Sequence, residues 1–156
     1  MSDKASSPGG TDDARPVVGT RIGELRVSVD RKRLVAYAAA GGDRNRIHWD
    51  EAYAIDAGLP GVIAHGMWTM GAAVELVSQW VGDPCAVIDY RTKFSAPVVV
   101  PAREAVEVCT EGHISRVDVA ANGELRVVVD LTVTCAGHKV LTRAQAVVSW
   151  KEPVGA

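Results

Sequence analysis

The chain has 156 residues, 47% of them hydrophobic and 23% charged, and its formal net charge is -2. A chain of this size fits one domain with one hydrophobic core, and this balance excludes a disordered or fibrous protein. Lysine and arginine are scattered singly along the sequence. No basic stripe is therefore available to neutralise a run of phosphates, and we expect no nucleic-acid partner.

The cysteines and the hydropathy of the chain bear on its location. Cys85, Cys109 and Cys135 are odd in number and far apart, and they lack the paired spacing of a zinc site or a disulfide framework. The N-terminus has no apolar run like that of a signal peptide, and no stretch offers about 18 uninterrupted apolar residues. We therefore expect a soluble cytoplasmic protein without a membrane partner.

The N-terminal part of the chain predicts a tail followed by a strand and a helix. Residues 1–16 are rich in Ser, Gly, Pro and Asp, so we interpret them as a flexible tail before a single domain at 17–152. Alternating apolar residues predict a strand at 17–29. Asp30 is a suitable N-cap for a helix at 31–40, which two glycines end.

A long apolar helix is the centre of the predicted domain. Residues 43–61 mix polar residues with glycine and proline, which is typical of a structured loop, with a helical turn at 50–57. Residues 66–81 are apolar almost all round, as expected of a helix that protein covers on most sides. The breakers at 82–84 end this helix.

Four strands are predicted after this helix. Their ranges are 86–100, 104–117, 124–135 and 139–151. A strand, a short helix, a covered central helix and a four-stranded antiparallel meander together predict an α+β hot-dog fold, in which one curved antiparallel sheet wraps around a central α-helix. Another open α+β sandwich is the alternative.

Residues 37–48 contain the first candidate for chemistry. Asp43 and His48 stand five residues apart across a bend, so their side chains can converge on one point. Removing water from a 3-hydroxyacyl group needs a base for the C2 proton and an acid for the departing hydroxyl, and a carboxylate with an imidazole supplies both. The alternative is an Asx turn at Asp43 beside a loop histidine that has no catalytic role.

Residues 60–67 contain the second candidate. Gly66 stands at the start of the apolar helix, where backbone N–H groups are free and the helix dipole is positive. A thioester carbonyl that accepted a hydrogen bond there would be polarised, which makes the C2 proton more acidic and stabilises an enolate-like transition state. The alternative is a glycine that only lets the helix pack closely.

Together these two stretches resemble the MaoC-like family of R-specific enoyl hydratases and 3-hydroxyacyl dehydratases. The family signature is an aromatic residue, small residues, and then Gly-Asp-x-Asn-Pro-aliphatic-His. In this chain its places are taken by Tyr37, Gly42, Asp43, Asn45, Ile47 and His48. Arg46 stands where the family has proline, which frees an N–H group and removes a constraint on φ in the loop.

The resemblance covers nearly the whole chain after the tail, and it is strongest to the B-type subunits of mycobacterial (3R)-hydroxyacyl-ACP dehydratases. It extends through residues 64–67, 80–84 and 91–98. It implies that Asp43 and His48 are the catalytic pair and that the backbone amide of Gly66 receives the thioester oxygen. It also implies a hydro-lyase that acts on a (3R)-3-hydroxyacyl or enoyl thioester in fatty-acid, unusual lipid or polyketide metabolism.

Other residues near these stretches receive lesser roles. Asn45 is expected to brace the loop by hydrogen bonds to backbone groups. His65 and His48 have no third ligand at metal-binding spacing, so we predict no metal and no cofactor. Tyr37, Met67 and Met70 are candidates for an acyl tunnel, although such residues at helical spacing are also typical of a plain core.

The partners of the chain follow from the resemblance. The expected substrate is an acyl-ACP or an acyl-CoA. Hot-dog protomers bury their sheet edges by pairing, so we expect a homodimer or a heterodimer with another hot-dog subunit. Two alternatives for function are a hot-dog acyl thioesterase and a non-catalytic subunit that binds the acyl chain for a partner.

Overall fold

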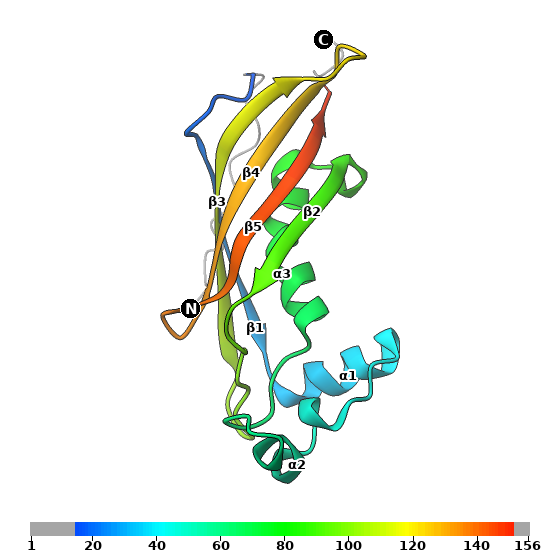
Figure 1. Ribbon diagram of the computed structural model, residues 1–156, viewed down its shortest axis with the longest axis vertical. Helices are drawn as coiled ribbons and strands as arrows, with labels where there is room; N and C mark the ends of the chain where they lie inside the picture. The colour runs from blue at the N-terminus through cyan, green and yellow to red at the C-terminus, as the bar shows by residue number, and fades with distance from the viewer. Residues whose placement is uncertain (1–14, 152–156) are drawn as a thin grey trace, which may run out of the picture.

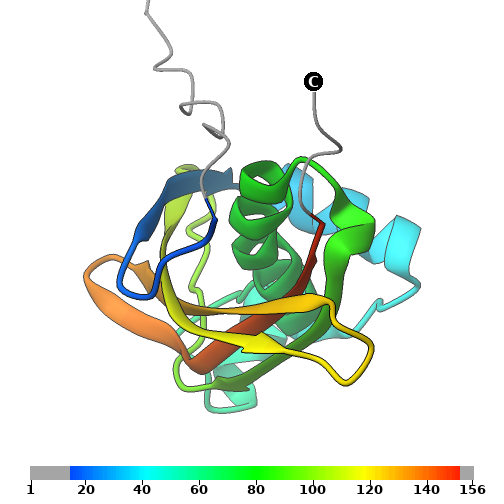
Figure 2. The same ribbon diagram turned by 90° about the horizontal axis from the view of Figure 1, so that it is seen from above.

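The computed structural model describes residues 15–151, and Figures 1 and 2 show a curved sheet around one long helix. The elements in chain order are β1 (Arg21–Val29), α1 (Arg31–Gly41), the 3-10 turn η1 (Arg46–His48), α2 (Glu51–Asp56), α3 (Gly66–Val81), the 3-10 turn η2 (Pro84–Ala86), β2 (Val87–Phe94), β3 (Val106–Val119), β4 (Leu125–Cys135) and β5 (His138–Trp150). The α+β hot-dog prediction is confirmed.

The order of the strands corrects one part of that prediction. The antiparallel sheet has the order β1-β3-β4-β5-β2, so β2 pairs with β5 and not with β3, its neighbour in sequence. The four strands after α3 are therefore not a simple meander. Tight turns join β3 to β4 and β4 to β5, whereas residues 95–105 form a long connection that carries the chain from one edge of the sheet to β3, beside β1.

Two predicted strand boundaries also change. A turn in which the Thr20 N–H donates to the Val17 carbonyl at 3.1 Å precedes β1, so the strand begins at Arg21 and not at 17. The strand predicted at 86–100 ends at Phe94, before Pro97, which cannot donate a ladder hydrogen bond. Of the tail predicted at 1–16, residues 1–14 lie outside the part of the chain that the structure describes.

Helix α3 packs one face against the concave side of the sheet. Its buried residues recur at helical spacing and are Thr69, Ala73, Leu76 and Val77. Ala73, Leu76 and Val77 join inward-facing strand residues such as Val108, Val129 and Val148 in a single core. The opposite face is open, and Met67 is 63% exposed. The helix is therefore covered on fewer sides in the single chain than its sequence predicts.

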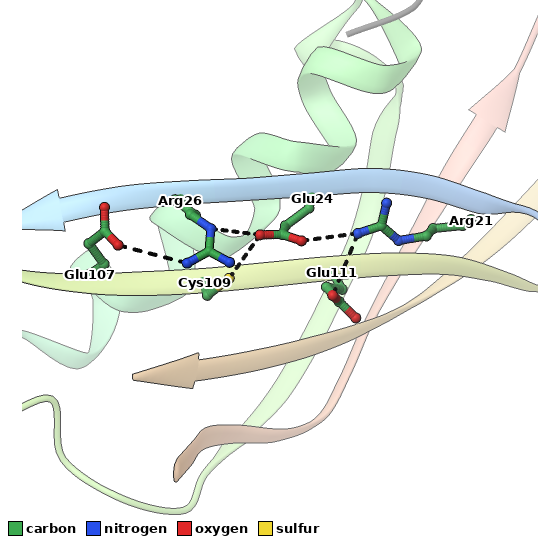
Figure 3. Close-up of polar contacts among 6 residues, drawn as sticks. All are labelled: Arg21, Glu24, Arg26, Glu107, Cys109 and Glu111. Atoms are coloured by element: carbon green, nitrogen blue, oxygen red, sulfur yellow. Dashed lines mark hydrogen bonds and ion pairs between the residues drawn. The ribbon is translucent and has the colours of Figure 1, made fainter. Parts of the chain in front are cut away.

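The solvent face of β1 and β3 carries a network of charged side chains (Figure 3). Glu24 lies between Arg21 and Arg26, at 3.1 and 2.7 Å, and the thiol of Cys109 donates to its carboxylate at 3.5 Å. These hydrogen bonds, first the one from the thiol and then the one from Arg26, lower the pKa of Glu24. Burial and the Glu24 carboxylate raise the pKa of Cys109, so this thiol stays protonated and is a poor nucleophile.

None of the helices in residues 15–151 has both the length and the apolar character needed to span a bilayer.

Candidate active site

The loop after α1 is built by side chains that imitate backbone turns. Gly42 ends α1 with φ of 75°, the left-handed conformation that glycine adopts without strain. The Asp43 carboxylate then accepts the N–H of Asn45 at 3.1 Å, and the side-chain oxygen of Asn45 accepts the N–H of Ile47 at 3.3 Å. These two Asx turns lead the chain into η1, which ends at His48.

The residue before Arg46 has a conformation that also suits a proline at position 46. Asn45, the residue before it, has φ of -57° and ψ of 132°, which is the extended conformation that a following proline imposes. The Arg46 guanidinium lies 2.6 Å from the Asp50 carboxylate and 4.4 Å from the centre of the Tyr53 ring. The hydrogen bond from Arg46 lowers the pKa of Asp50, the N-cap of α2. An ion pair to α2 thus supports the turn that a proline ring would make rigid.

His48 is a buried ring with a defined tautomer. Only 6% of the residue is exposed, and its Nδ1 lies 2.8 Å from the carbonyl oxygen of Ile63. Because a carbonyl only accepts, Nδ1 carries the proton, and Nε2 of the neutral ring has a free lone pair. This Nε2 lies 3.7 Å from Oδ2 of Asp43. The distance is too long for a direct hydrogen bond but allows one reactant oxygen to contact both groups.

His65 lies beside this pair and was not assigned to it from the sequence. It is 1% exposed, and its Nε2 donates to the backbone carbonyl of Asp43 at 3.0 Å. Its ring stacks on the ring of His48, with centroids 3.8 Å apart and planes at 22°. Burial lowers the pKa of His65, so the ring is neutral near pH 7. The sequence signal for this role is the polar residue His65 between the buried Ala64 and the start of α3.

Within residues 15–151, these three residues form the group that could hold a metal ion. Asp43, His48 and His65 each offer one ligand atom, and these atoms lie within 4.8 Å of one another. Asp43 therefore supplies the third ligand position that the sequence spacing did not reveal. One nitrogen of the His48 ring and one of the His65 ring already donate a hydrogen bond to a backbone carbonyl. The absence of a metal stays a prediction.

The N-terminus of α3 opens onto the same place. Gly66 is the first helical residue, and the side chain of the N-cap, His65, makes no capping hydrogen bond to this turn. The helix start therefore presents backbone N–H groups that side chains do not cap. A Cβ on Gly66 would lie 3.1 Å from ring atoms of Phe94, so only glycine lets that ring approach the helix start this closely.

A pocket of about 560 Å³ joins these groups. Asp43, His48 and Gly66 line its polar side, and Ile63, Val98 and Leu141 are among its apolar wall. A larger hollow of about 680 Å³ lies over β2, β4 and β5, and its lining includes Arg91, Lys93 and Arg143 but none of the predicted catalytic residues. The predicted catalytic residues Asp43, His48 and Gly66 therefore line the smaller of these two pockets.

The residues predicted for an acyl tunnel are not in the lining of this pocket. The ring of Tyr37 lies 4.9 Å from the ring of His65, and Met67 is exposed on the open face of α3. Met70 is half-buried. Their role in binding an acyl chain stays a prediction.

The comparisons with known proteins identify the family of the chain. The family model of the MaoC-like domain matches residues 13–133. The chain belongs to the MaoC-like family. The fatty acid synthase beta subunit TOXC of Cochliobolus carbonum is 33% identical to this MaoC-like chain over 126 residues, which are 81% of it. The 3-hydroxyacyl-thioester dehydratase X of Mycobacterium tuberculosis is 39% identical over 76 residues, which are 49% of it. The matched segments span 6% and 26% of these relatives.

Solved structures show the same similarity. A MaoC-like dehydratase superposes with a TM-score of 0.83 and 38% identity, over 92% of this MaoC-like chain and 43% of that one. The ChsH1-ChsH2 complex of Mycobacterium tuberculosis superposes with a TM-score of 0.73 and 20% identity, over 86% of this chain and 98% of that one. The second likeness shows the fold alone, and it comes from a complex. These names show that the family includes dehydratases, which are hydro-lyases.

Proposed function

We propose that this domain interconverts a (3R)-3-hydroxyacyl thioester and the corresponding 2-enoyl thioester by loss or gain of water. The observation that supports this most directly is the approach of Oδ2 of Asp43 to Nε2 of His48, at 3.7 Å, in the pocket that contains the start of α3. One carboxylate, one imidazole and one set of backbone N–H groups are the three parts that this reaction needs.

The hydration direction begins with Asp43 ionised and His48 protonated at Nε2. The Asp43 carboxylate takes a proton from a water molecule, and the water oxygen forms a bond to C3 as the C2–C3 double bond opens. His48 gives its Nε2 proton to C2. The products are the 3-hydroxyacyl thioester, protonated Asp43 and neutral His48, and dehydration is the reverse. The hydrogen bond from Nδ1 to the Ile63 carbonyl keeps Nε2 as the reacting nitrogen in both directions.

The helix start stabilises the charge that develops on the thioester oxygen. As C3 is attacked, electron density moves to the carbonyl, which becomes enolate-like. The Gly66 N–H and the positive end of the α3 dipole are suited to that oxygen. The ring of Phe94 lies close to the same residue, with ring atoms 3.1 Å from the place of a Cβ on Gly66.

The carrier and the location are further parts of the proposal. We infer an acyl-ACP or acyl-CoA substrate, since both carry the acyl group as a thioester on the same flexible arm, and a role in fatty-acid or related lipid synthesis, as the similarity to a fatty acid synthase subunit supports. Three free cysteines favour a reducing cytoplasm as the location.

A second hot-dog chain is the proposed partner. In residues 15–151, β2 pairs with β5 alone, so its other edge has unused backbone groups. Ile88 and Phe94 on β2 are 47% and 51% exposed. A chain that paired with this edge would cover both residues and would lie beside the mouth of the pocket.

The test is hydration of short enoyl-CoA thioesters by the purified chain, followed as loss of enoyl absorbance, with free thiol measured in parallel. Asp43→Asn and His48→Gln should each lower kcat by about 10²- to 10⁴-fold. His113→Gln is the control, because His113 is an exposed histidine on β3. Hydration by both site variants at the wild-type rate would overturn the proposal, and thiol release without enoyl loss would indicate a thioesterase instead.

A further inference from the structure

His65 joins the two halves of the site. Its carbonyl accepts the N–H of Thr69 at 3.1 Å and the Thr69 hydroxyl at 3.2 Å, which fixes its backbone to the first turn of α3. Its side chain reaches back to the loop after α1, where Nε2 donates to the Asp43 carbonyl. One residue therefore connects the helix that receives the thioester oxygen to the loop that carries the acid and base.

The ring of His65 also sets the position of His48. The two rings stack at 3.8 Å between centroids, so the His65 ring closes one face of the His48 ring. The Ile63 carbonyl holds one edge of the His48 ring at Nδ1. The stack supports one face of the same ring and so helps to keep Nε2 directed toward Asp43. The ring of Tyr37 also contacts His65, with ring centroids 4.9 Å apart.

We infer that His65 is a positioning residue of the proposed reaction, which holds Asp43 through its backbone carbonyl and His48 through ring stacking, so that both groups face one substrate. This inference rests on the proposed function of Asp43 and His48. His65 itself donates no proton to the substrate. Its Nε2–H is used by the Asp43 carbonyl, and in the described part of the chain its Nδ1 is buried without a hydrogen-bond partner.

The alternative is a histidine that only fills the core. Two substitutions distinguish a positioning role from a space-filling role, because each keeps one of the two contacts of the His65 ring. His65→Gln places an amide N–H where Nε2–H lies and loses the stack, and His65→Phe keeps a ring against His48 and loses the donor. A residue that only filled space would tolerate Phe, which is apolar and of similar shape, at least as well as Gln.

The experiment measures kcat and KM for enoyl-thioester hydration in these variants and in the Asp43→Asn background. His65→Phe should lower kcat by about 10- to 100-fold with KM nearly unchanged. The kcat of His65→Gln should lie between those of His65→Phe and the wild type. In the Asp43→Asn background the same His65→Phe change should cost less than about threefold, because the group that it positions no longer reacts. An unchanged kcat, or the same loss in both backgrounds, overturns the inference.

Two further measurements keep the inference testable. If His65→Phe fails to fold, the test uses His65→Gln instead. This substitution must lower kcat by a larger factor in the wild-type protein than in the His48→Gln variant. If the wild-type chain shows no hydration, the proposed function is wrong, but the positioning of His48 by His65 can still be tested. The measurement is then the NMR chemical shifts of the ¹⁵N atoms in the His48 ring. They must move in His65→Gln and stay unchanged in His113→Gln, and unmoved shifts in both variants overturn the positioning role.

Discussion

Asp43 and His48 face each other at 3.7 Å, yet one is 54% exposed at its side chain and the other 7%. The imidazole is held inside the domain by a backbone carbonyl and a second ring, whereas the carboxylate lies at the mouth of the pocket. A buried imidazole next to an exposed carboxylate suits the proposed reaction, in which water contacts the carboxylate and the C2 proton is exchanged with the imidazole.

This asymmetry predicts that two variants with similar losses of activity differ in stability. His48→Ala leaves the Ile63 carbonyl without its donor and a gap beside His65, so the free energy of unfolding should fall by about 1 to 3 kcal/mol. Asp43→Asn keeps the size of an exposed side chain, so its free energy of unfolding should match that of the wild type. Urea denaturation of both proteins measures the difference. Equal stabilities would contradict the described burial of His48.

Gly66→Ala should impair turnover more than it changes stability. The new methyl group would lie 3.1 Å from the ring of Phe94, so the ring must move away from the helix start, while alanine is a better helix former than glycine by about 1 kcal/mol. We expect a clear fall in kcat with little change in melting temperature. Gly71→Ala is the matched control on the same helix, because a Cβ there meets nothing within 4 Å. Equal activity of the two variants would argue against a reactive role for the helix start.

Arg46→Pro should retain the proposed hydratase activity. The conformation of Asn45 already suits a following proline, and Arg46 is the first residue of the 3-10 turn, so the proline ring should keep Asp43 and His48 facing each other. The ion pair to Asp50 is lost, and proteolysis at α2 should become faster. Arg46→Gly, which supplies neither the ion pair nor the ring, is the comparison. A large loss of activity in Arg46→Pro would show that the backbone here differs from the family's.

Local signals explain how much the sequence predicted. The limits of α3 at 66 and 81 were predicted to the residue, because Gly66 starts and Gly82 ends a continuous apolar pattern. The convergence of Asp43 and His48 followed from two glycines and two Asx residues, which act within a few positions of each other. Arg46 was the departure from the family pattern, and its ion pair with Asp50 is again a contact between near neighbours.

Contacts between distant segments were not readable in the same way. Pairing of β2 with β5 depends on where residues 95–105 take the chain, which no periodicity encodes. The stack of His65 on His48 joins residues 17 positions apart that belong to different elements, and a single histidine before a helix carries no sign of such a neighbour. Tertiary packing decides both.

The open edge of β2 predicts a dimer that one substitution disrupts. Antiparallel pairing of two β2 strands about a twofold axis would place Asp89 of one chain opposite Arg91 or Lys93 of the other, and opposite charges favour such pairing. Ile88→Glu puts a carboxylate into this contact and should give a monomer by sedimentation equilibrium. Val119→Glu, at an exposed position near the turn between β3 and β4, is the control and should stay dimeric. A wild-type chain that is monomeric alone would favour a heterodimer with another hot-dog subunit.

His65 should make the domain less stable in mild acid. Its pKa in the folded chain is lowered from the ordinary value of 6.5, chiefly by burial, with the nearby His48 ring adding to this effect and the Asp43 carboxylate and carbonyl opposing it. The Tyr37 ring also lies beside His65, with centroids 4.9 Å apart. Below about pH 6.5 the unfolded chain binds a proton that the folded chain does not. The contribution of His65 to the free energy of unfolding is therefore complete above pH 6.5 and declines as the pH falls toward the folded pKa, by at most about 1.4 kcal/mol per pH unit.

Urea denaturation at several pH values between about 5 and 8 measures this slope. His65→Gln removes the titrating group, so its stability should depend less steeply on pH than that of the wild type in the acid half of the range, and the two slopes should agree above pH 6.5. His113→Gln, at an exposed position on β3, should retain the wild-type slope. Parallel curves for the wild type and His65→Gln would mean that His65 takes up its proton without cost, which a ring only 1% exposed and stacked on a second imidazole should not do.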